Sequence, residues 1–323
     1  MKAVHCISVL AIASLGSGQT QDPKPHNATA AVVRAFDTHN IVLFGEAHGC
    51  KQEYEWLAQL VGSPEFASRV DDIVVELGNS LSQKAVDNYI AGAEVPFEQV
   101  ERAWRDAIGM INAPSPVHEL LFKAVREANQ RRRGQHQMRI VLGGPPGDWD
   151  KIKTRSDLTP FLQRRDSSYA QIVNKEVLAR KRRALLIMGS LHFERLNGPG
   201  SIERELLSSG ASTYLVLFST KVYDDPAKRF AAWPVPAIVE LGNNWVGDMP
   251  AMPPDFPGEP PKLRDIADAV LVVSQNPSTL TVLAMPRAEL DGTLYGKELE
   301  RRMTIMGRHL EIPDQPERPL GSR

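Results

Sequence analysis

Two histidines occupy the same short pattern at distant places in the chain. In each copy, four apolar residues are followed by a glycine, two further residues and the histidine. The copies are Ile41-Val42-Leu43-Phe44-Gly45-Glu46-Ala47-His48 and Leu185-Leu186-Ile187-Met188-Gly189-Ser190-Leu191-His192. Each histidine lies where a buried strand should break into a loop or helix. Imidazole serves as a general base and as a metal ligand, so two such strands lying parallel and close together would place His48 and His192 across one pocket.

Glu76 is the acidic residue that points most strongly to a functional site. It lies in the apolar run 73–77, which is continuous rather than alternating and therefore typical of a parallel strand covered on both faces. A carboxylate there loses hydration worth several kcal/mol unless it is paired, hydrogen-bonded or protonated. Its expected partners are the imidazoles or a metal. The alternative is an edge strand that turns Glu76 to solvent.

A carboxylate beside a histidine can support the activation of water, because it sets the tautomer of the imidazole and raises its basicity. Glu76 can take this part. So can Glu46, which stands two residues before His48 and could also bind a metal itself. The predicted catalytic residues are therefore Glu46, His48, Glu76 and His192. The predicted metal ligands are His48, Glu76 and His192.

Strand and helix patterns alternate through most of the chain and would position these residues. Apolar runs predict strands at 41–44, 73–77, 138–142, 185–188, 213–218 and 269–273. Amphipathic spacing predicts helices from about 49 and at about 81–91, 97–110, 116–130, 160–182, 201–209 and 294–307. This order predicts an α/β fold with a mostly parallel central sheet flanked by helices and right-handed crossovers. The segment 233–261 holds eight prolines and is expected to be irregular.

Further polar residues follow the predicted strands at the edge where ligands of parallel sheets bind. They are Asn79, Asp148 and Glu194. Cys50 could be a thiol nucleophile at a helix N-terminus, but residues two apart on a helix point about 200° apart, which argues against a direct pair with His48. The remaining histidines of the predicted domain are interpreted as surface or structural: His39, His118, His136 and His309.

The composition limits the class of partner. The chain has 323 residues, long enough to bury a sizeable core without disulfides or metal. Lys and Arg number 38 against 39 Asp and Glu, a net charge of -1. This balance gives no electrostatic reason to expect nucleic acid or an anionic membrane as a partner. The expected ligand is a small molecule or a peptide.

The two ends of the chain are expected to lie outside the folded domain. Residues 1–18 resemble a secretory signal peptide, which places the protein in the periplasm or outside the cell. A polar leader (19–30), a single α/β domain (31–312) and a disordered tail (313–323) are expected to follow. Beyond the signal, no run approaches the roughly 20 apolar residues of a membrane span. The mature chain is therefore expected to have no integral membrane segment.

The order of the motifs resembles a superfamily that joins ChaN-like haem-uptake proteins, the TIKI/TraB group and the erythromycin esterases. The likeness rests on the strand before Gly45-Glu46-Ala47-His48, the strand that ends in Glu76, and the strand before Gly189-Ser190-Leu191-His192. It covers roughly 35–220, with the last strand as a further candidate. The esterases have one more residue between the glutamate and the histidine. The spacing found here is more similar to the ChaN-like branch.

This resemblance implies two different functions. In the esterases a histidine assisted by glutamates activates water, and those roles fall on His48, Glu46 and Glu76, with His192 as second histidine. In TIKI-type proteins a divalent metal serves peptide hydrolysis. We therefore expect a hydrolase of ester or amide bonds in a small molecule or peptide, with or without a divalent metal. The alternative, from the ChaN-like branch, is an uptake protein that binds haem or metal without turnover, although an aromatic content of 7% offers little to a planar haem.

Overall fold

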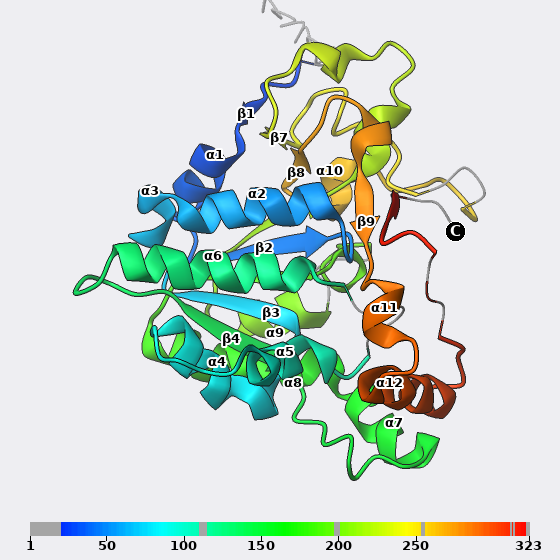
Figure 1. Cartoon of the computed structure of the whole chain (residues 1–323). Coiled ribbons are helices and arrows are strands. Elements are labelled where there is room, and N and C mark those ends of the chain that lie inside the picture. Colours follow the sequence, from blue (N-terminus) through cyan, green and yellow to red (C-terminus); the bar gives the residue numbers. More distant parts are fainter. Residues whose placement is uncertain are drawn as a thin grey trace, which may run out of the picture.

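The computed structural model describes residues 21–109, 115–196, 201–252, 256–310, 312 and 314–320. The predicted signal peptide (1–18) lies outside the described residues. Helices cover an eight-stranded sheet (Figure 1). The sheet has the strand order β1-β7-β8-β6-β2-β5-β3-β4. The predicted mostly parallel α/β fold is therefore confirmed.

The strands of the parallel part match the predicted apolar runs closely. They are β2 (Ile41–Glu46), β3 (Asp72–Asn79), β4 (Arg139–Gly144), β5 (Ala184–Gly189), β6 (Thr213–Phe218) and β8 (Ala269–Val272). Two further strands extend the sheet beyond β8. They are β7 (Ala237–Glu240), which pairs antiparallel with β8, and β1 (His26–Asn27), which pairs antiparallel with β7. The Pro-rich segment thus contains one strand, and part of the predicted polar leader is paired in the sheet.

Strand β5 lies between β2 and β3 although it follows both in the chain. It pairs in parallel with β2, with Glu46 opposite Gly189, and in parallel with β3, with Val75 opposite Ile187. The two strand-Gly-x-x-His units are therefore direct neighbours, as the sequence predicts. Three adjacent strands, β2, β5 and β3, end at the same edge of the sheet.

Both faces of the sheet are covered. One face packs on helices α1 (Ala28–Ala35), α2 (Lys51–Gly62), α3 (Pro64–Ala67), α4 (Gln83–Ile90), α5 (Phe97–Arg105) and α6 (Val117–Arg131). In Figure 1 α2 and α6 lie side by side in front of the sheet. The other face packs on α8 (Arg165–Glu176), α9 (Ser201–Ser208) and α10 (Leu263–Ile266). Successive residues of β2 alternate between the two cores, which explains why the apolar runs are continuous.

One predicted helix is divided in two. The pattern at 160–182 predicts a single helix, but α7 (Arg155–Gln163) and α8 are separate and meet at Arg164. α7 begins earlier than expected because the Thr154 side chain accepts from the N–H of Asp157 and Asp157 completes the capping box. The division makes Arg165 the first residue of α8.

The C-terminal part of the chain runs along the edge at which the parallel strands end (Figure 1). It consists of β9 (Thr281–Leu283), α11 (Arg287–Leu290), α12 (Leu294–Ile305) and β10 (Glu317–Pro319). Strand β10 pairs antiparallel with β9, so part of the tail that was expected to be disordered is a strand. Glu317 also forms an ion pair with Lys51 (3.0 Å), and the N–H of Leu283 donates to the carbonyl of Gly49 (2.9 Å). These contacts hold the turn that follows His48.

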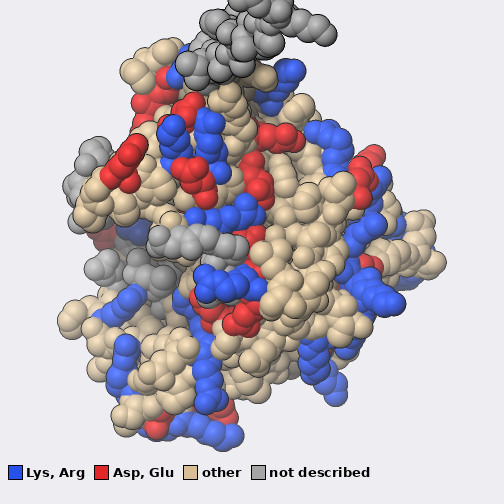
Figure 2. Space-filling view, turned by 180° about the vertical axis from the view of Figure 1, so that it is seen from behind, with Lys and Arg blue, Asp and Glu red and all other residues tan. Residues whose placement is uncertain are grey.

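Two further features bear on the partners of the protein. No helix in the described ranges is both long and apolar enough to cross a membrane. On the face shown in Figure 2, Lys and Arg side chains are interspersed with Asp and Glu. The charge balance of the sequence therefore also holds locally on that face.

The close approach of β2 to the turn after β5 makes a prediction for Gly45. A Cβ at this position would lie 2.4 Å from Cδ2 of Leu217 and 3.0 Å from Cα of Ser190. We expect Gly45→Ala to destabilise the fold by about 1–3 kcal/mol, as overpacking does. Urea unfolding measures the change. Gly242→Ala is the control, because its Cβ would meet nothing within 4 Å; equal stability of the two variants would contradict the prediction.

Candidate functional site

The carboxyl ends of β2, β5 and β3 bring together the four residues that the sequence singles out. Glu46 is the last residue of β2, and His48 lies in the turn before α2. Glu76 lies in β3, at the point where the register with β4 shifts. His192 ends a short 3-10 helix, Ser190–His192, directly after β5. The site is therefore built on neighbouring strands and not on distant loops.

Glu46 orients His48. The Nδ1 atom of His48 lies 3.0 Å from Oε1 of Glu46, which is buried, while the His48 side chain is 34% exposed. A carboxylate accepts hydrogen bonds, so Nδ1 carries the proton and Nε2 is directed away from Glu46. Nε2 lies 4.0 Å from Oε2 of Glu76. His48 thus stands between two carboxylates with one nitrogen toward each.

Glu76 is the centre of the group. It is buried in an internal strand, so the alternative of an edge strand turned to solvent is wrong. Its Oε2 accepts the backbone N–H of Gly189 (2.8 Å). A Cβ at position 189 would lie 2.9 Å from Nε2 of His48. Gly189, the glycine of the second motif, therefore leaves room for the imidazole of the first motif.

His192 reaches Glu76 from the other side of the group. Its Nε2 lies 3.6 Å from Oε1 of Glu76, and its Nδ1 lies 3.1 Å from Oδ1 of Asp166. The two histidines therefore contact different oxygens of one carboxylate. The sequence suggested that His48 and His192 face each other directly, whereas in the structure Glu76 lies between them.

Arg165 and Asp166 are the residues that the sequence analysis missed. Arg165 lies 3.6 Å from Oε1 of Glu76 through Nη1 and donates to Nε2 of His192 through Nη2. Both residues stand in the first turn of α8, within a stretch rich in charged residues. Nothing in that stretch distinguishes these two residues from their solvated neighbours, so the sequence holds no signal for them.

The electrostatics of the group centre on His48 and Glu46. Burial opposes a charge on His48, but the hydrogen bond to Glu46 and the charges of Glu46 and Glu76 raise its pKa to about 9. Burial likewise opposes ionisation of Glu46, yet the hydrogen bond from His48 and its charge hold the pKa of Glu46 below its ordinary value. Near neutral pH the pair is therefore an imidazolium and a carboxylate.

A second buried layer lies behind this pair. Glu53, in the first turn of α2, accepts the N–H of Ala47 (3.1 Å), and burial together with the charge of Glu46 raises the pKa of Glu53 well above its usual range. His118 contacts the hydroxyl of Tyr54 (3.3 Å), and burial lowers the pKa of His118 to about 4. Of the two interpretations of His118, surface or structural, the structure supports the second: it is a buried, neutral structural histidine.

Cys50 is not suited to be a nucleophile. Its thiol is buried, and burial together with the charge of Glu53 raises its pKa to about 12. A thiolate is the reactive form of cysteine. The structure therefore supports the sequence-based argument against Cys50 as a nucleophile.

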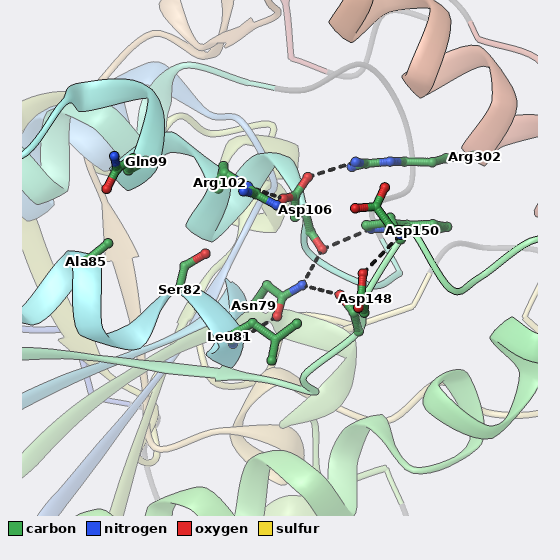
Figure 3. Close-up of a pocket in the computed structure, with 12 residues that line it drawn as sticks. Asn79, Leu81, Ser82, Ala85, Gln99, Arg102, Asp106, Asp148, Asp150 and Arg302 are labelled. Atoms are coloured by element: carbon green, nitrogen blue, oxygen red, sulfur yellow. Dashed lines mark hydrogen bonds and ion pairs between the residues drawn. The ribbon is translucent and has the colours of Figure 1, made fainter.

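The remaining strand-end residues lie apart from His48. Asn79 donates to the carbonyls of Asp106 (2.9 Å) and Gly147 (2.7 Å), and Asp148 pairs with Lys151 (3.0 Å). Asn79 and Asp148 line a separate cavity of about 360 Å³, in which Arg302 pairs with Asp106 (Figure 3). Glu194 is half-buried, with its N–H donating to the carbonyl of Ser190 (3.1 Å). Asn79 thus ends β3, while Asp148 and Glu194 lie in the loops that follow β4 and β5.

The donor set at the site fits a metal ion. Glu46, His48 and Glu76 each offer one ligand atom, and these atoms all lie within 4.8 Å of one another. Oε2 of Glu46 is buried without a hydrogen bond of normal geometry among the described residues, although the nearby Tyr54 hydroxyl helps to lower the pKa of Glu46. One histidine and two carboxylates suit divalent cations such as zinc or manganese. His192 was expected as a ligand, but in the described structure it stands outside this three-residue group.

Comparisons with known proteins give distant structural likenesses only. No protein-family model matches the sequence, and no curated protein matches it. A Bacillus cereus protein of known structure is 12% identical, with a TM-score of 0.47, over 78% of this chain and 94% of its own. The type III effector HopBA1 is 13% identical, with a TM-score of 0.43, over 80% and 100%. ChaN of Campylobacter jejuni, described with cofacially bound haem, is 12% identical, with a TM-score of 0.38, over 76% and 91%. At these scores the likenesses carry no argument about function.

The arrangement of Glu46 and His48 makes a prediction that needs no knowledge of a substrate. We expect NMR titration of the metal-free protein to give a pKa of about 9 for His48. Glu46→Gln removes both the charge and the ionic hydrogen bond, so it should lower that pKa. Glu65→Gln, at an exposed site on α3, should leave it unchanged. An unchanged His48 pKa in Glu46→Gln would show that Glu46 does not control this imidazole.

Proposed function

We propose that the protein is a hydrolase that uses Glu46, His48 and Glu76 to activate water against an ester or amide bond, with a divalent metal held by the same three residues. The observation that carries the proposal is the convergence of their ligand atoms within 4.8 Å, next to a buried oxygen of Glu46 without a hydrogen bond of normal geometry among the described residues. When bound there, a divalent cation would lower the pKa of water and polarise a carbonyl group. The substrate class is a small molecule or a peptide.

The side chains around this group have distinct parts in the proposal. Glu46 holds one proton of His48 on Nδ1. A cation at Nε2 would displace the second proton, and the lone pair of Nε2 would then face Glu76 and the solvent. Gly189 anchors Glu76 through its N–H, so the carboxylate cannot swing away. The partial exposure of His48 gives a substrate access to the group. The carboxylates that raise the proton affinity of His48 also favour the binding of a metal cation in place of that proton.

The binding of haem without turnover is the alternative, and it follows from the motif spacing of the ChaN-like branch. Every Phe, Trp and Tyr side chain among the described residues is buried or half-buried. The described surface therefore offers no fully exposed aromatic face on which a porphyrin could stack. This observation favours the hydrolase.

The proposal predicts metal-dependent turnover. The purified protein should contain a divalent metal by elemental analysis and hydrolyse p-nitrophenyl acetate or a generic peptide substrate, and a chelator should abolish the activity. His48→Ala and Glu76→Gln should each lower kcat roughly 100- to 10,000-fold. His309→Ala, at an exposed histidine, is the matched control and should keep full activity.

Three results would change this conclusion. A haem absorption band without hydrolysis would favour the uptake alternative. Hydrolysis that survives the double variant of His48→Ala with Glu76→Gln would contradict the site assignment. Full activity after metal removal would leave His48 and its carboxylates as the base, with no role for a cation.

Gly189 provides a further test, because it separates geometry from chemistry. In Gly189→Ala the new Cβ meets Nε2 and Cε1 of His48 at 2.9 and 3.0 Å. The half-exposed imidazole can move, so stability should change by less than about 1 kcal/mol, while a misplaced catalytic group can cost about 100-fold in rate. Thermal unfolding and kcat measured on the same preparation check both parts. Normal kcat in Gly189→Ala would mean that the position of His48 is unimportant.

A further inference from the structure

Arg165 has more hydrogen-bonding capacity than its protein neighbours use. Its side chain is only 21% exposed. Among the described residues its guanidinium makes one hydrogen bond, to Nε2 of His192. Its contacts with Glu76 (3.6 Å) and Asp166 (3.8 Å) are ion pairs beyond hydrogen-bond distance. Among the residues that the structure describes, most of the five N–H groups of the guanidinium therefore have no protein acceptor within hydrogen-bond reach.

The backbone and the neighbouring side chains hold Arg165 in this position. Gly109 has a φ of 93°, and a Cβ there would lie 2.8 Å from Nη1 of Arg165. The backbone of Gly109 thus lies directly against the guanidinium. His192 and Asp166 hold it from the other side. An arginine held this firmly with unused donors is a ready site for an oxyanion.

The same contacts determine the tautomer of His192. Arginine can only donate, so Nε2 of His192 accepts from Arg165 and carries no proton. The proton lies on Nδ1, which faces Oδ1 of Asp166 (3.1 Å). In this arrangement His192 cannot give a proton through Nε2 to a leaving group or an oxyanion. The sequence analysis treats His192 as the second catalytic histidine, but the donor at this position is Arg165.

We propose that Arg165 binds the oxyanion that forms on the carbonyl oxygen of the substrate, and that His192 and Asp166 are positioning residues for its guanidinium. This inference rests on the proposed hydrolase function. Both Arg165 and His48 contact Glu76, one at each carboxylate oxygen. A carbonyl carbon near Nε2 of His48 would thus turn its oxygen toward Arg165.

The chemical step balances without any further reactant. The oxygen of water bonds to the carbonyl carbon, and the π electrons move to the carbonyl oxygen, where Arg165 donates to the oxyanion. When the C=O bond is restored, the C–O or C–N bond to the leaving group breaks. The leaving alcohol or amine takes up the proton that the water releases. One water is consumed, and an acid and an alcohol or amine are formed.

The test compares Arg165→Met with Arg164→Met, its exposed neighbour. Arg165→Met should lower kcat for p-nitrophenyl acetate roughly 100- to 1000-fold, the loss expected for one oxyanion donor, with KM changed far less. Arg164→Met should match the wild type. Arg165→Lys, which keeps the charge, covers the case in which Arg165→Met does not fold by circular dichroism; it should recover only part of the rate because it lacks the planar fork.

Two measurements distinguish the positioning role of His192 from a merely structural one. Nitrogen-15 NMR of the metal-free protein should show His192 protonated at Nδ1 and not at Nε2. His192→Gln offers an amide oxygen to Arg165 and should retain far more kcat than His192→Ala. A protonated Nε2, or equal kcat in the two His192 variants, would overturn the positioning role.

The outcomes separate this inference from the proposed function. Hydrolysis by the wild type with unchanged kcat in Arg165→Met overturns the oxyanion role and leaves the hydrolase intact. Absence of hydrolysis in the wild type overturns the hydrolase and this inference with it. A loss confined to KM would mean that Arg165 binds the ground state of the substrate and not the oxyanion, which also overturns the proposal.

Discussion

The burial of the Glu76 carboxylate is the constraint on which the site depends. A strand covered on both faces cannot hold an unpartnered carboxylate, since its desolvation alone costs several kcal/mol. The fold meets this requirement with the N–H of Gly189, the guanidinium of Arg165 and the imidazoles of His48 and His192. These partners come from three places in the chain: the turn after β2, the end of β5 with the 3-10 helix that follows it, and the start of α8. Glu76 therefore also links these segments at the edge of the sheet.

The strand order makes these contacts possible. Because β5 enters between β2 and β3, the two strands that carry histidines and the strand that carries Glu76 are adjacent. Close contact between neighbouring segments requires small residues at the ends of these strands. Gly45 and Gly189 meet this requirement, because a Cβ at either position would clash with a neighbouring residue. The glycine that both motifs share is therefore explained by close packing at these two positions.

The site also concentrates charge in a buried place. Glu46 and Glu76 are both buried, and Arg165 and the protonated His48 balance them in the metal-free protein. Burial and the charge of Glu46 raise the pKa of Glu53 well above its usual range, which disfavours a third negative charge beside Glu46. The negative charges of the two carboxylates can therefore be compensated either by the proton on His48 or by a cation bound between the carboxylates.

The sequence by itself determined the parallel core, the pairing of the two Gly-x-x-His units and the importance of Glu76. Those features follow from local signals: continuous apolar runs, a repeated spacing, and one carboxylate inside a buried strand. The tertiary structure alone decided that Arg165 and Asp166 join the site, because a break between two helices turns a solvated pattern inward. It also decided that β7 and β10 are strands, since such short segments form only when a neighbour supplies the hydrogen bonds. Local sequence patterns indicate which residues are buried, whereas the residues that contact them are determined only by the tertiary structure.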